Sequence, residues 1–117
     1  MSVTVLIVDD HPSFRASART LLEAEGYDVV GEAEDGESAL AAVASLRPEL
    51  VLLDVQLPDL DGIQASRKIG AIDRGAAIVL ISSRDVTDLA GALAESPALG
   101  FIPKSELSGA KLRELLT

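Results

Sequence analysis

Four short apolar runs divide this chain, and an acid, hydroxyl or amine side chain follows the C-terminal end of each. Runs of this length that are rich in Val, Ile and Leu are typical of strands buried on both faces of a parallel sheet. The C-terminal ends of parallel strands share one edge of the sheet, so we expect the polar residues to meet in one pocket. The runs and their polar followers are Val5–Val8 with Asp9 and Asp10, Leu50–Leu53 with Asp54, Ile78–Ile81 with Ser82 and Ser83, and Leu99–Ile102, then Pro103, with Lys104.

Helical patterns separate these runs. Pro12 suits the first turn of a helix, where its missing N–H costs nothing, and Gly26 suits the end of that helix. With a second strand at Asp28–Ala33, the alternation predicts an α/β fold of five βα units in one domain, residues 1–117, with helices on both faces of a parallel sheet. The other expected helices are one capped by Asp35, one over Ile63–Ile72, one over Val86–Leu93 and one capped by Ser108.

Composition excludes several classes of protein. The net charge of −9 argues against binding of nucleic acid or of an anionic membrane surface by this domain. The absence of cysteine excludes disulfides and thiolate metal sites. No apolar run reaches the ~20 residues that a membrane helix needs, and the N-terminus has no signal-peptide pattern. We therefore expect a cytoplasmic protein.

The residue types in the expected pocket suit a divalent cation and a phosphoryl group. Asp10 and Asp54 can each give Mg²⁺ an oxygen, Asp9 can act through water, and a backbone carbonyl after Asp54 can give another. Asp54 stands alone at the end of an apolar strand, so it is the candidate nucleophile for an aspartyl phosphate. Lys104 would neutralise the phosphoryl oxygens, and Ser82 could donate a hydrogen bond to them.

Each residue also has an ordinary structural interpretation. The occurrence of all four signals in register favours the functional one. The structural alternatives are helix capping by Asp9 and Asp10, helix capping by Ser82 and Ser83, an ion pair or a surface position for Lys104, and an exposed polar position for His11.

Four motifs in this order resemble the receiver domain of bacterial two-component response regulators, the chemotaxis-Y-like fold. They are VLIVDDHPSFR at 5–15, LVLLDVQLPDLDG at 50–62, IVLISS at 78–83 and GFIPKSEL at 100–107. The resemblance covers essentially the whole chain. It implies the strand order 2-1-3-4-5, Mg²⁺ as cofactor, and phosphorylation by a histidine kinase or a phosphotransfer protein.

The resemblance also implies roles for the matching residues. Phosphorylation would draw the switch hydroxyl inward, the aromatic residue would follow, and the face of the fourth helix, fifth strand and last helix would change. The implied roles are phosphoacceptor for Asp54, metal-binding acids for Asp9 and Asp10, a backbone carbonyl to the metal for Gln56, switch hydroxyl for Ser82, phosphate-binding lysine for Lys104 and aromatic switch for Phe101.

The motifs DDHP and IPKSEL resemble the subclass that often carries a C-terminal helix-turn-helix domain of the LuxR type. We therefore expect a DNA-binding output domain in a longer parent chain, phosphorylation-dependent homodimerisation, and no output domain within these residues. The chain departs from many receivers because Ser105, not proline, follows Lys104. Gln56 and Arg84 occupy positions that tune the phosphoryl lifetime in this family.

Other functions stay open at this level. The chain could be a degenerate receiver that acts only as a phosphorylation-independent interaction module. A phosphohydrolase of the haloacid dehalogenase type would need an acid two residues after Asp54, where Gln56 stands. A flavodoxin-like cofactor binder would need a hydroxyl-rich phosphate loop after the first strand, where two acids stand. We therefore predict a switch that is not a turnover enzyme, with only limited self-phosphotransfer and autodephosphorylation.

Overall fold

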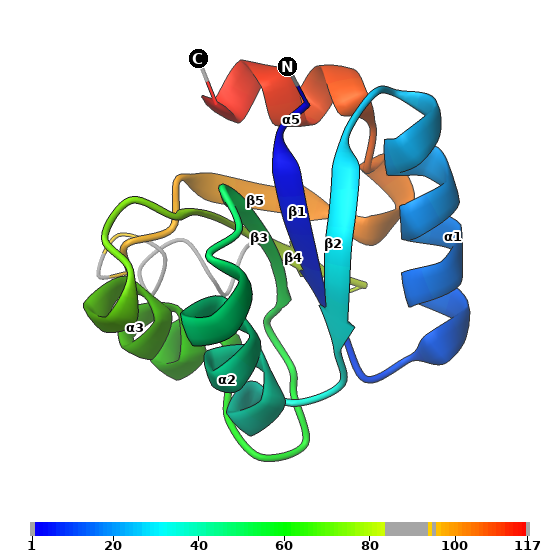
Figure 1. Cartoon of the computed structure of the whole chain (residues 1–117). Helices are drawn as coiled ribbons and strands as arrows, with labels where there is room; N and C mark the ends of the chain where they lie inside the picture. Colours follow the sequence, from blue (N-terminus) through cyan, green and yellow to red (C-terminus); the bar gives the residue numbers. More distant parts are fainter. Residues whose placement is uncertain (1, 84–93, 95, 117) are drawn as a thin grey trace.

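A computed structural model describes residues 2–83, 94 and 96–116, and its five strands form one parallel sheet (Figure 1). The strand order is β2-β1-β3-β4-β5, which confirms the expected fold class and topology. The expected helix over Val86–Leu93 lies outside the described residues. The strands are β1 (Thr4–Val8), β2 (Asp28–Ala33), β3 (Leu50–Asp54), β4 (Ala77–Ser82) and β5 (Gly100–Pro103).

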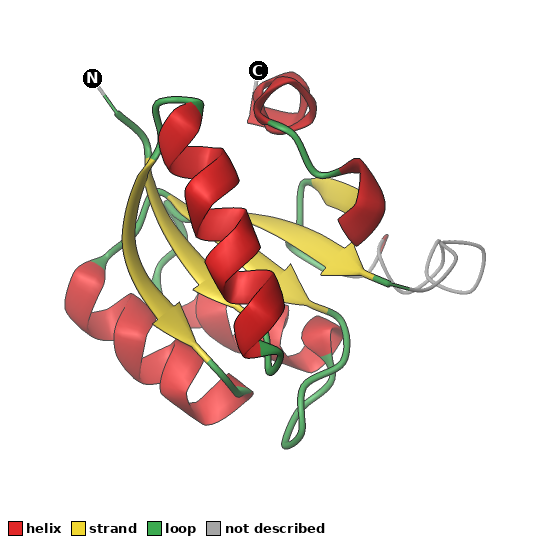
Figure 2. Ribbon diagram, turned by 90° about the vertical axis from the view of Figure 1, so that its right-hand side faces the viewer, coloured by secondary structure: helices red, strands yellow, loops and turns green. Residues whose placement is uncertain are grey.

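Helices lie on both faces of the sheet, as Figures 1 and 2 show. They are α1 (Pro12–Ala24), α2 (Gly36–Leu46), α3 (Gly62–Ile72) and α5 (Gly109–Leu116), with a 3₁₀ turn, η2, at Lys104–Glu106. None of the described helices is long and apolar enough to cross a membrane. The peptide bonds of the described residues are all trans. The bond between Lys104 and Ser105, where many receivers have proline after the lysine, is therefore trans as well.

Alternation along the strands divides the apolar core into two layers. Side chains such as Val5 and Ile7 pack with α1 and α5, whereas Leu6 and Val8 pack with α2 and α3. The same alternation runs through β3 and β4, whose side chains are all buried or nearly so. This two-sided burial explains why these strands read as continuous apolar runs and why polar residues can start only where the strands end.

Local signals set the ends of several helices. Asp35 caps α2 by accepting a hydrogen bond from the backbone N–H of Ser38, and the two residues form a capping box. Ser108 accepts from the N–H of Lys111 at the start of α5. Gly26 follows α1 with a φ of +93°, a conformation that favours glycine. These three positions confirm the helix ends predicted from the sequence.

Candidate functional site

Three of the predicted residues come into direct contact at the C-terminal edge of the sheet. The Lys104 Nζ atom lies 2.6 Å from Asp9 Oδ2 and 3.2 Å from Asp54 Oδ2. Asp9 is fully buried, Asp54 is 3% exposed, and the Lys104 side chain is 14% exposed. An ammonium thus lies between two buried carboxylates that follow β1 and end β3.

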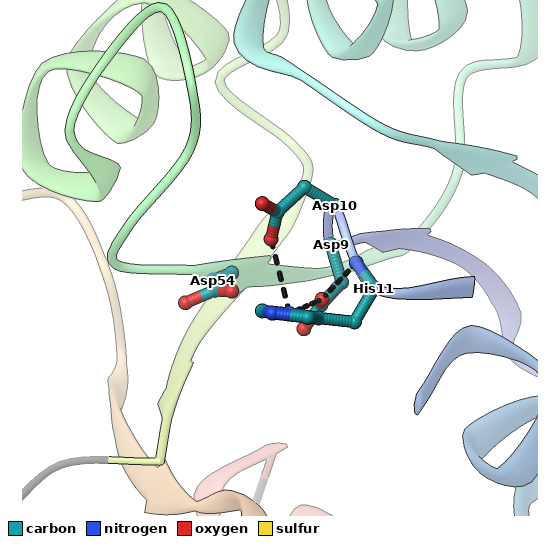
Figure 3. A group of neighbouring side chains, drawn as sticks. All are labelled: Asp9, Asp10, His11 and Asp54. Carbon is teal, nitrogen blue, oxygen red and sulfur yellow. Dashed lines mark hydrogen bonds and ion pairs between the residues drawn. The ribbon is translucent and has the colours of Figure 1, made fainter. Parts of the chain in front are cut away.

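Asp10 and His11 complete a wider group with Asp9 and Asp54, shown in Figure 3. One possible ligand atom from each of these four residues can be chosen so that all lie within 4.8 Å of one another. The His11 Nδ1 atom is 3.0 Å from Asp9 Oδ1 and 3.1 Å from Asp10 Oδ1. His11 is exposed, as predicted from the sequence, and it is also part of the cluster. The sequence feature that could have indicated this contact is the position of His11 directly after Asp9 and Asp10.

The backbone around Asp9 explains how the cluster is held. The N–H of His11 donates to Asp9 Oδ1 at 2.8 Å, so the two residues form a tight local turn before α1. Arg15, one turn into α1, donates through Nη1 to the Asp9 carbonyl at 2.6 Å. The residue at the N-cap of α1 is His11, and Pro12 occupies the first turn. Asp9 therefore fixes the turn instead of capping the helix.

The loop after Asp54 is tightly packed against the strand end. The N–H of Gln56 donates to Asp54 Oδ1 at 3.0 Å, and the N–H of Gly62 donates to the Val55 carbonyl at 2.8 Å. A Cβ at Gly62 would lie 2.5 Å from Val55 Cα and 2.8 Å from the Asp54 carbonyl oxygen. Only glycine lets α3 begin this close to the end of the strand.

Burial and charge perturb the two ionisable partners. Burial, together with the nearby charge of Asp9, raises the pKa of Asp54 above its ordinary 3.8, against the opposing effects of the Gln56 N–H hydrogen bond and of Lys104. Burial acts to lower the pKa of Lys104, but its contacts with Asp9 and Asp54 outweigh burial and raise it above 10.5. At neutral pH the lysine is therefore a fixed positive charge beside the Asp54 carboxylate.

The donor set suits a hard divalent cation. Asp9 Oδ2 is buried and lies within ion-pair distance of Lys104 Nζ. It receives no well-directed hydrogen bond from the described residues. Three carboxylates have oxygen atoms within 4.8 Å of one another, and their mutual repulsion favours a bound cation. Carboxylate oxygens are the ligands that Mg²⁺ prefers, with waters completing its shell. The residues present therefore fit Mg²⁺.

The remaining predicted residues lie near this edge with different exposures. Ser82 is buried at the end of β4, where it pairs in register with Pro103 of β5. Phe101 is partly buried and packs against the core layer of α2 and α3. Gln56 is exposed in the loop after β3. The structure thus places Ser82 at the end of the strand that pairs with β3, Gln56 in the loop after β3, and Phe101 on the edge strand.

Comparison with known proteins agrees with this geometry. Residues 5–117 match the response regulator receiver domain. The chain is 33% identical to the response regulator GacA of Pseudomonas aeruginosa over 97% of its own length and 52% of that protein. It is also 33% identical to the transcription regulator BvgA of Bordetella pertussis, over 87% of its own length and 49% of that protein. The chain therefore spans about half the length of these curated relatives.

Solved structures give the same result. A LuxR-family two-component response regulator from Aurantimonas matches with a TM-score of 0.88 and 31% identity, covering 99% of this chain and 86% of that one. The signal receiver domain of NarL from Mycobacterium tuberculosis matches with a TM-score of 0.85 and 32% identity, covering 98% and 97%. With the fold, the acid group and the lysine in place, these matches show that the chain belongs to the response regulator receiver domain family.

Proposed function

We propose that this receiver domain is phosphorylated on Asp54, with Mg²⁺, by a histidine kinase or a phosphotransfer protein. Membership of the family supports a phosphorylation-dependent signalling switch. The observation that carries the finer proposal is the Asp54 carboxylate, buried at the end of β3 with Lys104 Nζ 3.2 Å away and the acids of the β1 edge beside it. A carboxylate in this setting can attack phosphorus while the ammonium neutralises the oxygens.

The proposed reaction forms one bond and breaks one. An oxygen of Asp54 forms a bond to phosphorus as the bond between phosphorus and the donor nitrogen or oxygen breaks, and the leaving group takes that electron pair. Lys104 would keep its proton throughout, because Asp9 and Asp54 raise its pKa. The ligands that we propose for Mg²⁺ are the carboxylates of Asp9, Asp10 and Asp54 and the backbone carbonyl of Gln56. The ion would supply further positive charge to the phosphoryl oxygens.

We infer that Ser82 and Phe101 carry the switch. The Ser82 hydroxyl is buried at the end of β4, one strand from Asp54, where it could hydrogen-bond a phosphoryl group. Phe101 is partly buried on the adjacent strand β5, and we propose that its ring moves inward when the domain is phosphorylated. The surface of β5 and α5 would change as a result. This coupling makes the domain a switch and not a turnover enzyme.

The output is proposed from the relatives. BvgA is a transcription regulator and GacA a response regulator, and both are about twice as long as this chain. We propose that this receiver works with a C-terminal DNA-binding domain in a longer chain and that phosphorylation promotes homodimerisation. The net charge of −9 supports a receiver that does not itself contact DNA.

Intact mass spectrometry after brief incubation with acetyl phosphate tests the proposal. We expect one added phosphoryl group that requires both Mg²⁺ and Asp54, so that Asp54→Asn gives no adduct. Asp28→Asn serves as a matched control, because Asp28 is exposed at the far end of β2. A persistent adduct on Asp54→Asn would overturn the site assignment. If no adduct forms and beryllofluoride with Mg²⁺ does not stabilise the protein, the chain is a phosphorylation-independent interaction module.

A further inference from the structure

The imidazole of His11 reaches into the proposed metal site instead of pointing away into solvent (Figure 3). Its Nδ1 atom contacts one oxygen of Asp9 and one of Asp10, while its own backbone N–H is fixed to the same Asp9 carboxylate. The side chain is 64% exposed, so a hydrated ion can approach it directly from solvent. His11 is thus held over the acids and remains open on its outer side.

The distances fit a shared metal ion. Nitrogen and oxygen ligands bind small divalent cations at about 2.1 Å, so neighbouring ligands of an octahedral ion lie about 3.0 Å apart. The two Nδ1–oxygen separations, 3.0 and 3.1 Å, agree with that spacing. The Asp9 oxygen that faces His11 is Oδ1, whereas Oδ2 is buried and lies 2.6 Å from Lys104 Nζ.

We propose that His11 is a nitrogen ligand of this site, which gives it a higher affinity for first-row transition-metal dications than an all-oxygen site would have. This inference rests on the metal site of the proposed function. Imidazole binds ions such as Mn²⁺ and Zn²⁺ well, whereas Mg²⁺ prefers oxygen and binds imidazole poorly. His11 would therefore change the choice of metal, and not simply the strength of binding.

A histidine that only hydrogen-bonds the acids would act differently. Its removal would change the charge and order of the two carboxylates, which bind every divalent ion, and the affinities for Mg²⁺ and Zn²⁺ would move by the same factor. A ligating histidine changes the ratio of the two affinities. The ratio therefore separates a ligand from a residue that only supports the acids.

Electron spin-echo modulation of Mn²⁺ bound to the full chain gives the direct test. We expect nitrogen modulation from imidazole in the wild type and its loss in His11→Gln, which keeps a polar side chain of similar reach. The chain contains one histidine and no cysteine, so the assignment of the nitrogen signal is unambiguous. Absence of nitrogen modulation in a wild-type sample with bound Mn²⁺ would overturn the proposal.

Calorimetric titrations with Mg²⁺ and with Zn²⁺ give the second test. In His11→Gln we expect the Zn²⁺ affinity to fall about tenfold or more, while the Mg²⁺ affinity stays within about threefold. Equal losses for both ions would overturn the inference and leave the proposed function intact. If the wild type binds neither ion, the metal site of the proposed function itself fails.

Discussion

Lys104 is held by an aromatic ring as well as by two carboxylates. Its Nζ atom lies 4.6 Å from the centroid of the Phe14 ring. Phe14 lies on α1 and packs against the core layer that α1 and α5 cover. The ring face attracts the ammonium, and the carboxylates of Asp9 and Asp54 hold it from the other directions. This contact makes Phe14 a positioning residue for the lysine.

A double-mutant cycle tests this contact. Phe14→Leu should destabilise the protein more in the wild-type background than in Lys104→Ala, with a coupling of about 0.5–2 kcal/mol in the free energy of unfolding by urea. Phe14→Tyr keeps the ring and should retain most of the coupling. Additive effects of Phe14→Leu and Lys104→Ala would show that the ring only fills space.

The sequence could predict some of these residues and not others, for a physical reason. Asp9, Asp54 and Lys104 lie at or directly after the C-terminal ends of strands, and a parallel sheet brings such positions to one edge whatever the details of packing. His11 and Phe14 act through the direction of their side chains, which depends on how α1 leaves the turn after β1. A pattern of apolar and polar residues carries no information about that direction.

At the scale of elements, the loop after β3 is tied to α2. The Asp59 carboxylate accepts hydrogen bonds from the N–H groups of Gly36 at 2.7 Å and Glu37 at 2.9 Å, in the first turn of α2. Leu60 packs on the same turn, where a Cβ on Gly36 would lie 2.5 Å from Leu60 Cδ1. The loop that leads from Asp54 into α3 is therefore anchored at its far end to another helix.

Asp59→Asn should weaken this anchor. The hydrogen bond from Gly36, with that from Glu37, lowers the pKa of Asp59 below its ordinary 3.8. A lowered pKa means that the carboxylate stabilises the fold above pH 3.8 and that this contribution is lost as the pH falls through the lowered value. We expect Asp59→Asn to lower the midpoint of urea unfolding at pH 7. This difference from wild type should vanish when the pH is below the lowered pKa of Asp59.

The control for this measurement is Asp28→Asn, which removes the same charge from an exposed position. It separates loss of the anchor from relief of the overall negative charge. An equal midpoint for Asp59→Asn and Asp28→Asn at pH 7 would show that the contact with α2 contributes nothing to stability.

The caps of α2 show what the sequence could predict at this scale. The cap from Asp35 is predicted from the sequence, because its partner Ser38 lies only three positions further along the chain. The cap from Asp59 joins residues 23 positions apart and depends on where the loop lies after folding. Strand and helix bounds follow from local signals, whereas links between elements need the tertiary arrangement.

For the whole molecule, the acid group is a cost to stability. The chain carries a net charge of −9, and three of its carboxylates meet at one edge of the sheet. Burial, with the charge of Asp9, raises the pKa of Asp54, so the ionised form of this residue is less favourable in the fold than in the unfolded chain. Stability contributed by this group is therefore lost as the pH rises through the raised pKa.

Asp54→Asn should accordingly stabilise the metal-free protein at pH 7, by about 1 kcal/mol in the free energy of urea unfolding. The gain over wild type should shrink as the pH is lowered through the raised pKa toward 3.8, because Asp54 then becomes neutral in both states. Asp28→Asn again corrects for the change in net charge. A lower stability of Asp54→Asn at every pH, with a chelator present, would contradict this account.

With Mg²⁺ present, the wild type should become more stable than Asp54→Asn. An ion that binds only the folded protein adds about 2.7 kcal/mol at a concentration of 100 times its Kd. The wild type should gain this stabilisation, while Asp54→Asn, which lacks one of the proposed carboxylate ligands, should gain less. Thermal unfolding with increasing Mg²⁺ should therefore show the two curves crossing. Parallel curves would mean that Asp54 is not a ligand of Mg²⁺. The destabilising carboxylate of Asp54 would then be needed only as the proposed phosphoacceptor.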